Sequence, residues 1–220
     1  MRPDPWQRWA PLSGIAYVVL LLVAFGIAGD GAGDEPGDVR AYYADAANRD
    51  REILVFFLLV AAALAFVWFL GMLRGALVRA EGEPARWTAL GFGAGTASAT
   101  LLLASASLFV APGAAATQEE FPLDPATANM FSNAGYALLV GSVMVAALLV
   151  VAASIVALRT ALLPRWSALS GFLVAAAQLF AIFFFPIFVW LGWVLAVSAI
   201  LILRSARVAD WRRGTSTAAD

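Results

Sequence analysis

Residues 166–203 read WSALSGFLVAAAQLFAIFFFPIFVWLGWVLAVSAILIL, 38 residues without one Asp, Glu, Lys or Arg. As a single helix rising about 1.5 Å per residue, this stretch would be about 57 Å long. That is nearly twice the hydrocarbon core of a bilayer, which is about 30 Å thick. Pro186 lies near the middle of the stretch and lacks the backbone N–H that a helix interior needs. We therefore expect two membrane spans here, at 167–184 and 187–203.

The rest of the chain repeats this pattern of long apolar runs. Further charge-free runs lie at 9–29, 53–73, 87–118 and 125–158. The 220 residues are 62% hydrophobic and only 13% charged, against about a quarter charged in soluble domains. The runs are too long and continuous for barrel strands of about ten alternating residues. We therefore expect an all-α, polytopic bundle of six transmembrane helices, the first four at 12–28, 53–73, 87–112 and 128–158.

Pro112 followed by Gly113 is expected to end the third span, because proline removes a donor and glycine tolerates turn geometry. The first span has a competing interpretation. An arginine before an apolar segment and small residues after it are also typical of a secretory signal peptide. The apolar segment is longer than is usual for that role, so we expect the first span to remain in the protein.

The arginines of the connecting segments support the count of six. Cytoplasmic loops of bacterial membrane proteins carry the excess of Lys and Arg. Six spans place eleven arginines on one side: Arg2, Arg8, Arg74, Arg79, Arg86, Arg159, Arg165, Arg204, Arg207, Arg212 and Arg213. The other side has only Arg40, Arg49 and Arg51. We therefore expect a multi-pass protein of the bacterial plasma membrane with both termini in the cytoplasm, a transmembrane domain over 1–207 and a cytoplasmic tail over 208–220.

Arg-Trp pairs begin the odd-numbered spans. They are Arg8-Trp9, Arg86-Trp87 and Arg165-Trp166, and Arg74, Arg159 and Arg204 close the even-numbered spans. Tryptophan prefers the membrane interface and arginine extends toward the headgroups, so we expect the pairs to be cytoplasmic interface anchors. The pairs are 78 and 79 residues apart, and the spans also read as three helical hairpins that repeat one unit. Both interpretations stay open.

The expected outer loop 29–52 is acidic. Asp30, Asp34, Glu35 and Asp38 lie there, and Glu119, Glu120 and Asp124 lie in the next outer segment. Clustered carboxylates suit Ca²⁺, but the spacing fits no EF-hand loop, so a calcium site is only an alternative and no metal ligand is assigned. After Pro36 we expect a short extracytoplasmic surface helix at about 37–50. Asp45 would pair with Arg49, and Val39, Tyr42 and Ala46 would form its apolar side.

Composition excludes several kinds of chemistry. Histidine and cysteine are absent, and all fourteen basic residues are arginine. Disulfides, cysteine or histidine metal ligands, Ser–His or Cys–His nucleophiles and lysine Schiff bases are therefore excluded. The spans contain no ionisable residue, which argues against proton-coupled pumps and voltage sensors. No basic patch indicates nucleic acid binding. We expect no catalytic residue, no cofactor and no metal.

Neutral polar residues remain inside the spans. Gln178, Asn129, Asn133 and Tyr136 are the candidates for ligand or interhelical contacts. An interhelical hydrogen bond of about 0.6–2 kcal/mol is the common role of such side chains. The alternative is a cavity lined by Gln178, Asn133 and Tyr136. In the third span, Gly91, Gly95 and Ala99 lie four residues apart and predict a face for close helix packing.

Three segments carry a family resemblance: RWAPLSG at 8–14, YYADAANRDRE at 42–52 and FVWFLGMLRGAL at 66–77. In this order they resemble uncharacterised six-helix integral membrane proteins of high-GC actinobacteria. The resemblance implies six spans and supplies no functional residues. We expect a non-enzymatic protein with a structural, accessory or partner-binding role, whose partners are the lipid bilayer and other membrane proteins or a second copy. The alternative is a carrier or binder of a neutral or lipidic small molecule in an intramembrane cavity.

Overall fold

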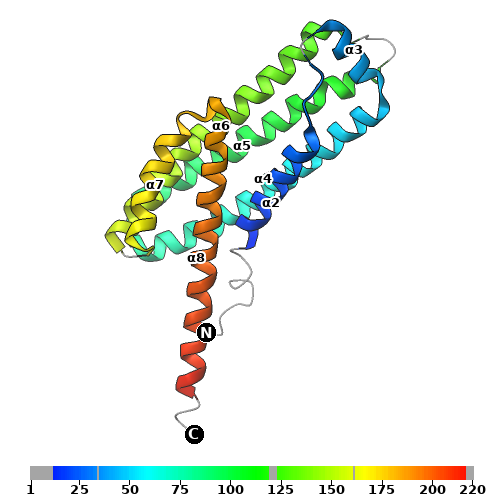
Figure 1. Ribbon diagram of the computed structural model, residues 1–220. Helices are drawn as coiled ribbons and strands as arrows, with labels where there is room; N and C mark the ends of the chain where they lie inside the picture. The colour runs from blue at the N-terminus through cyan, green and yellow to red at the C-terminus, as the bar shows by residue number, and fades with distance from the viewer. Residues whose placement is uncertain (1–11, 34, 119–122, 161, 217–220) are drawn as a thin grey trace.

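The computed structural model describes residues 12–33, 35–118, 123–160 and 162–216, with side chains described as far as Arg204. These residues are helical almost throughout (Figure 1). The elements in chain order are α2 (Leu12–Ala28), α3 (Pro36–Ala44), α4 (Ala46–Glu81), α5 (Arg86–Ala115), α6 (Pro125–Thr160), α7 (Arg165–Gln178), the 3₁₀ turn η1 (Ala181–Phe183) and α8 (Phe185–Ser216). The prediction of an all-α chain is confirmed for this part of the protein.

Four described helices are long and apolar enough to cross a membrane. They are α4, α5, α6 and the part of α8 over Phe185–Arg204. Helix α2 is apolar but has 17 residues, about 25 Å, and α7 has 14 residues, about 21 Å. Both are shorter than a hydrocarbon core of about 30 Å. The chain is therefore a helical membrane bundle with four candidate spans, and crossings by α2 and α7 stay a prediction.

Several expected boundaries differ from the observed ones. Helix α5 does not stop at Pro112 but continues to Ala115, and the Pro112 carbonyl accepts from the backbone N–H of Ala116 at 2.9 Å. The expected surface helix at 37–50 breaks at Asp45, whose carboxylate accepts from Ala47 N at 2.9 Å and caps the start of α4. Arg49 donates to the backbone oxygens of Tyr43 and Ala44 instead of pairing with Asp45.

The break near Pro186 is present, but it begins earlier than expected. Helix α7 ends at Gln178, η1 follows, and α8 begins at Phe185, which places the proline in the first turn where its missing N–H costs nothing. Phe184 has a φ of 63°, so the chain turns sharply there. Helix α8 continues to Ser216, through part of the expected tail, and extends beyond the end of the bundle that lies opposite α3 (Figure 1).

Helix α5 packs between α4 and α6. Gly91, Gly95 and Ala99 are all buried, as a close-packing face requires. A Cβ on Gly91 would lie 3.0 Å from the Ala152 Cβ of α6, and one on Gly95 would lie 2.5 Å from a Leu70 methyl of α4. Lipid supplies little hydrophobic drive between helices, so such close backbone approach is a main source of association.

Helices α2 and α8 are joined to α4 by an aromatic cluster. Trp190 Nε1 donates to the Tyr17 hydroxyl at 3.0 Å, which satisfies both buried polar groups. The ring of Phe66 in α4 lies 4.8 Å from the Tyr17 ring and 5.7 Å from that of Trp190. These three helices therefore share one part of the core.

The connection from α4 to α5 is held by one carboxylate. Glu81 accepts from the backbone N–H groups of Trp87 and Thr88 at 3.0 and 2.9 Å, and from the Thr88 hydroxyl at 2.6 Å. These donors lie in the first turn of α5, which has no partner for them within the helix. The Arg159 guanidinium lies 5.7 Å from the Trp87 ring centroid, so α6 also contacts this corner.

The two described Arg-Trp pairs have different surroundings. Trp87 is half-buried beneath Arg159, whereas Trp166 is 66% exposed. Arg86 and Arg165 are both exposed. Arg8 and Trp9 lie outside the described residues.

Replacing Gly91 with leucine is expected to destabilise the bundle by about 1–3 kcal/mol, because the new side chain must displace the rigid Ala152 contact. The matched control is Gly93→Leu in the same helix, where a Cβ meets no heavy atom within 4 Å. Thermal melts in mild detergent, followed by circular dichroism, would measure the difference. Equal melting temperatures for the two variants would contradict the packing role of Gly91.

Replacing Glu81 with alanine is expected to lower the free energy of unfolding by about 1–2 kcal/mol, the usual cost of losing a helix cap. Glu83→Ala removes an exposed carboxylate two residues away and serves as the control. Chemical unfolding of the two variants in detergent would compare them. A Glu81→Ala midpoint no lower than that of Glu83→Ala would rule the cap out.

Candidate functional site

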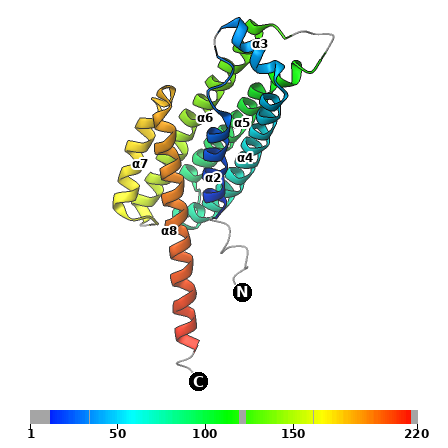
Figure 2. The ribbon, with the colours of Figure 1, turned by 45° about the vertical axis from the view of Figure 1, so that its right-hand side comes forward.

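A pocket of about 520 Å³ lies at the end of the bundle that carries α3. The end of α2, the loop 29–33, α3 and the first turns of α4 line one part of it, and α5 and α6 line the rest. Figure 2 shows α3 beside the ends of these long helices. Phe184, from the turn between α7 and α8, also contributes to the lining.

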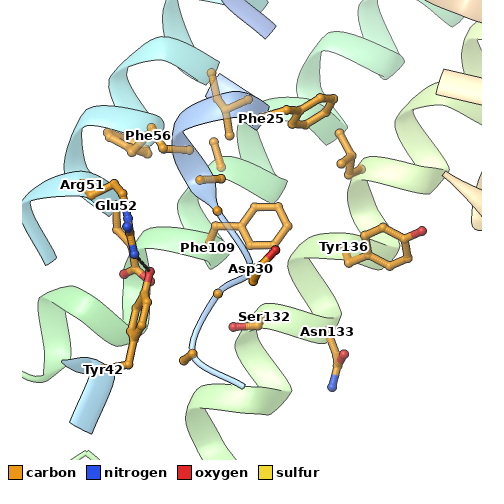
Figure 3. Close-up of a pocket in the computed structure, with 18 of the residues that line it drawn as sticks. Phe25, Asp30, Tyr42, Arg51, Glu52, Phe56, Phe109, Ser132, Asn133 and Tyr136 are labelled. Carbon is orange, nitrogen blue, oxygen red and sulfur yellow. Dashed lines mark hydrogen bonds between the residues drawn. The ribbon is translucent and has the colours of Figure 1, made fainter. Parts of the chain in front are cut away.

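The pocket interior is apolar. Phe25, Val55, Phe56, Leu59, Ala106, Phe109 and Leu139 line it. The ring of Phe109 lies against Gly135 of α6, where a Cβ would be only 3.2 Å from the ring. Gly135 therefore leaves room for the ring of Phe109, which stands in the middle of the site, to pack closely against α6 (Figure 3).

Helix α6 supplies a polar wall of neutral side chains. Asn129, Ser132, Asn133 and Tyr136 line the pocket, and their spacing of three and four residues places them on one helix face. The Tyr136 hydroxyl donates to the backbone oxygen of Ile182 at 2.8 Å, which ties this wall to the turn before α8. The structure thus brings three of the four predicted polar residues together.

Gln178 does not belong to this site. It is fully buried where α7 ends, and its Nε2 donates to the Val143 backbone oxygen at 3.1 Å. Its Oε1 has no hydrogen-bond partner among the described residues. The prediction of a cavity lined by Gln178, Asn133 and Tyr136 is therefore wrong for Gln178, since only the other two line the pocket. Sequence position alone does not show that Gln178 turns toward the middle of α6.

Helix α4 supplies a charged wall opposite α6. Arg51 Nη2 donates to the Tyr42 hydroxyl at 3.3 Å and to Asn48 Oδ1 at 2.9 Å, and the guanidinium lies 5.6 Å from the Tyr42 ring centroid. Glu52 follows it directly and is half-buried. Figure 3 shows Arg51, Glu52 and Tyr42 together on this side.

Tyr43 of α3 connects the surface helix to Glu52. Burial raises the pKa of Tyr43, and the charge of Glu52 and its hydrogen bond to the phenol raise it further. The phenol is therefore a neutral donor toward the carboxyl group. Val39, Tyr43 and Ala128 form a small buried cluster that holds α3 on α6. Tyr43, rather than the expected Tyr42, is the buried aromatic residue of this helix.

The loop 29–33 forms the rim. Gly29, Gly31 and Gly33 have φ angles of 68°, 78° and 73°, which only glycine adopts readily, and Asp30 stands between the first two. These alternating conformations let a short segment curve along the edge of the pocket. Asp30 lines the pocket with its neighbours.

The other acidic residues do not form a metal centre within the described part of the chain, where no group of three or more His, Cys, Asp or Glu residues is placed to hold an ion. Asp124 instead caps α6. It accepts from the backbone and hydroxyl of Thr127 at 2.9 and 3.0 Å, and these bonds lower the pKa of Asp124. Asp34, Glu119 and Glu120 lie outside the described residues.

Sequence reasoning missed the charged wall. Glu52 precedes the charge-free run 53–73 by one residue, so the sequence predicts that it belongs to the outer loop 29–52. In the structure α4 begins at Ala46, and the same rigid helix carries Arg51 and Glu52 into the end of the bundle. The signal that could have found them is Asp45, an N-cap residue seven positions before Glu52. The result is a site with one charged wall, one amide and hydroxyl wall and an apolar interior.

Comparison with known proteins gave no match: no family model, no curated protein and no solved structure is significantly similar to this chain. The resemblance to actinobacterial membrane proteins stays an expectation from the three quoted segments.

The pocket can be probed with cysteine, because the natural chain contains none. Ser132→Cys places a thiol in the pocket wall, and Ser142→Cys places one deep in the same helix, where Ser142 is buried and bonded to Ser98. We expect a small water-soluble methanethiosulfonate reagent to label the first variant at least tenfold faster. Intact-protein mass spectrometry would follow the reaction, and equal rates would show that the pocket is closed to water.

Proposed function

We propose that this chain is a non-enzymatic, six-span plasma-membrane protein that binds a small amphiphile in the pocket beside α3. The observation that carries the proposal is the pocket of about 520 Å³, in which a charged wall meets an apolar interior. Its volume is within the range of about 300–1,000 Å³ that is usual for small-molecule sites. A molecule with a polar head and an apolar body satisfies both parts of such a lining.

The proposed topology places the pocket on the extracytoplasmic side. In this arrangement α2 and α7 cross together with the long helices, and the chain forms three hairpins. Eleven arginines then lie on the inner side against three on the outer side, as the positive-inside rule requires. The start of α2 and the end of α8 lie toward the end of the bundle opposite α3, which is consistent with this orientation (Figure 1).

A purely structural, accessory or partner-binding role is the alternative. It would be served by a tightly filled bundle and does not need the pocket. The residues that line the pocket come from six separate parts of the chain, and four of these residues are neutral polar side chains on one face of α6. Ligand binding accounts for this convergence, so we favour it.

A substitution that fills the pocket tests the proposal. We expect native mass spectrometry from mild detergent to find an amphiphile bound to the natural protein, and Val55→Trp to reduce its occupancy at least fivefold. Val55 is a half-buried residue of α4 in the pocket lining. Val67→Trp is the control, because Val67 lies on the same helix, is 47% exposed and is not in the lining.

Circular dichroism and gel filtration would establish that both tryptophan variants are folded. Equal occupancy in the two folded variants, or a natural protein without any bound amphiphile in lipid-rich preparations, would refute the binding function.

A further inference from the structure

We infer that the pocket selects an organic cation: an amphiphile whose single positive charge lies between the carboxyl groups and the aromatic rings of the lining. This inference rests on the proposed binding function and names the class of ligand. It differs from the neutral or lipidic ligand that the sequence analysis gave as an alternative.

The charges of the lining favour a positive ligand. Two carboxyl groups, those of Asp30 and Glu52, line the pocket together with one guanidinium, that of Arg51. The other lining side chains are neutral. When both carboxyl groups are ionised, the pocket carries one uncompensated negative charge. A cation would compensate it, whereas an anion would add to the repulsion in a partly dry site.

Arg51 is already held by its own neighbours. Its Nη2 donates to Tyr42 and Asn48, and its guanidinium lies over the Tyr42 ring. Its Nε has no hydrogen-bond partner among the described residues, but its charge is outnumbered by those of Asp30 and Glu52. Arg51 therefore orders the wall and does not make the pocket an anion site.

The carboxyl group of Glu52 is not fully hydrogen-bonded by its neighbours. Its Oε2 is buried without a hydrogen-bond partner in the described part of the chain. Tyr43 and Tyr42 donate to the carboxyl group and the Arg51 charge lies close to it, but Oε2 itself is left without a partner among the described residues. Buried charged groups without compensation are costly, so a positive charge brought by a ligand has its largest effect here.

Aromatic rings supply the second element of cation recognition. Seven aromatic side chains line the pocket, and Phe56, Phe109 and Tyr42 are visible around its centre in Figure 3. The faces of such rings attract cations, and quaternary ammonium groups are commonly bound by cages of aromatic rings. The same rings also cover the apolar body of an amphiphile, so one set of side chains serves both parts of the ligand.

Two ions of the same shape and opposite charge test this inference. Tetraphenylphosphonium and tetraphenylborate have nearly equal size and apolar surface. Their binding would be measured at pH 8 by equilibrium dialysis against the full-length protein in phosphatidylcholine nanodiscs, with empty nanodiscs subtracting partition into lipid. We expect saturable binding of the cation at least tenfold tighter than that of the anion.

Three variants connect the selectivity to the lining. Glu52→Gln is expected to weaken cation binding at least tenfold and to leave anion binding unchanged or stronger. Arg51→Gln is expected to leave cation binding unchanged or tighter. Asp50→Asn is the matched control, because Asp50 is an exposed carboxylate on the same turn of α4 outside the lining, and it should have no effect. If Glu52→Gln does not fold, Asp30→Asn in the exposed rim loop is expected to weaken cation binding at least threefold.

The outcomes separate this inference from the proposed function. Equal binding of the two ions, or tighter binding of the anion, would overturn the inference, as would a folded Glu52→Gln with unchanged cation affinity. If Val55→Trp still displaces the bound amphiphile in that case, the binding function stands and only the ligand class is wrong. If Val55→Trp has no effect and neither ion binds, both fail.

Discussion

The close approach of α5 to α4 and α6 is the constraint on which the rest of the bundle depends. In lipid the helices gain little from hiding apolar side chains, so they are held where small residues let their backbones meet. Gly91 and Gly95 provide this contact, and the Ser98 and Ser142 hydroxyls bond across α5 and α6 at 3.1 Å in the same region. The small face continues to Ala106, and the ring of Phe109, one turn later, is part of the pocket. The pocket thus forms where the small-residue face ends.

Backbone hydrogen bonding explains why the irregular segment between α7 and α8 is tied to its neighbours. Non-helical backbone near a membrane needs partners for its carbonyls, because lipid supplies none. Tyr136 donates to the Ile182 oxygen, and the Phe184 ring lies 5.5 Å from that of Phe25. These contacts bring the turn beside the pocket, so the same residues that satisfy the turn also complete the lining. The contacts that pack the segment between α7 and α8 therefore also shape the pocket.

The sequence predicted the parts of the fold that depend on composition and covalent chemistry. Long charge-free runs indicated a helical membrane bundle, and Pro186 indicated a break that the structure places between Gln178 and Phe185. Predictions that depended on local signals alone were less successful. Pro112 did not end α5, because a proline removes one backbone donor without preventing the following turn. The surface helix broke at Asp45, because its side chain caps α4, and Arg49 donates to the backbone oxygens of Tyr43 and Ala44. The candidate site was only partly predictable, since Asn133 and Tyr136 converge while Gln178 bonds to α6 elsewhere.

The position of Glu52 shows why charge patterns conceal such a site. A charge at the end of an apolar run looks like the boundary of a span, and most such charges are exposed to water. Here α4 is continuous from Ala46, α3 is docked through Val39 and Tyr43, and the glycine-rich rim curves over the same end. These three features partly bury a carboxyl group that would otherwise be solvated. A partly buried carboxyl group beside aromatic rings is costly for an empty pocket and favourable for one that holds a cation, and this difference in free energy is the physical basis of the selectivity that we propose.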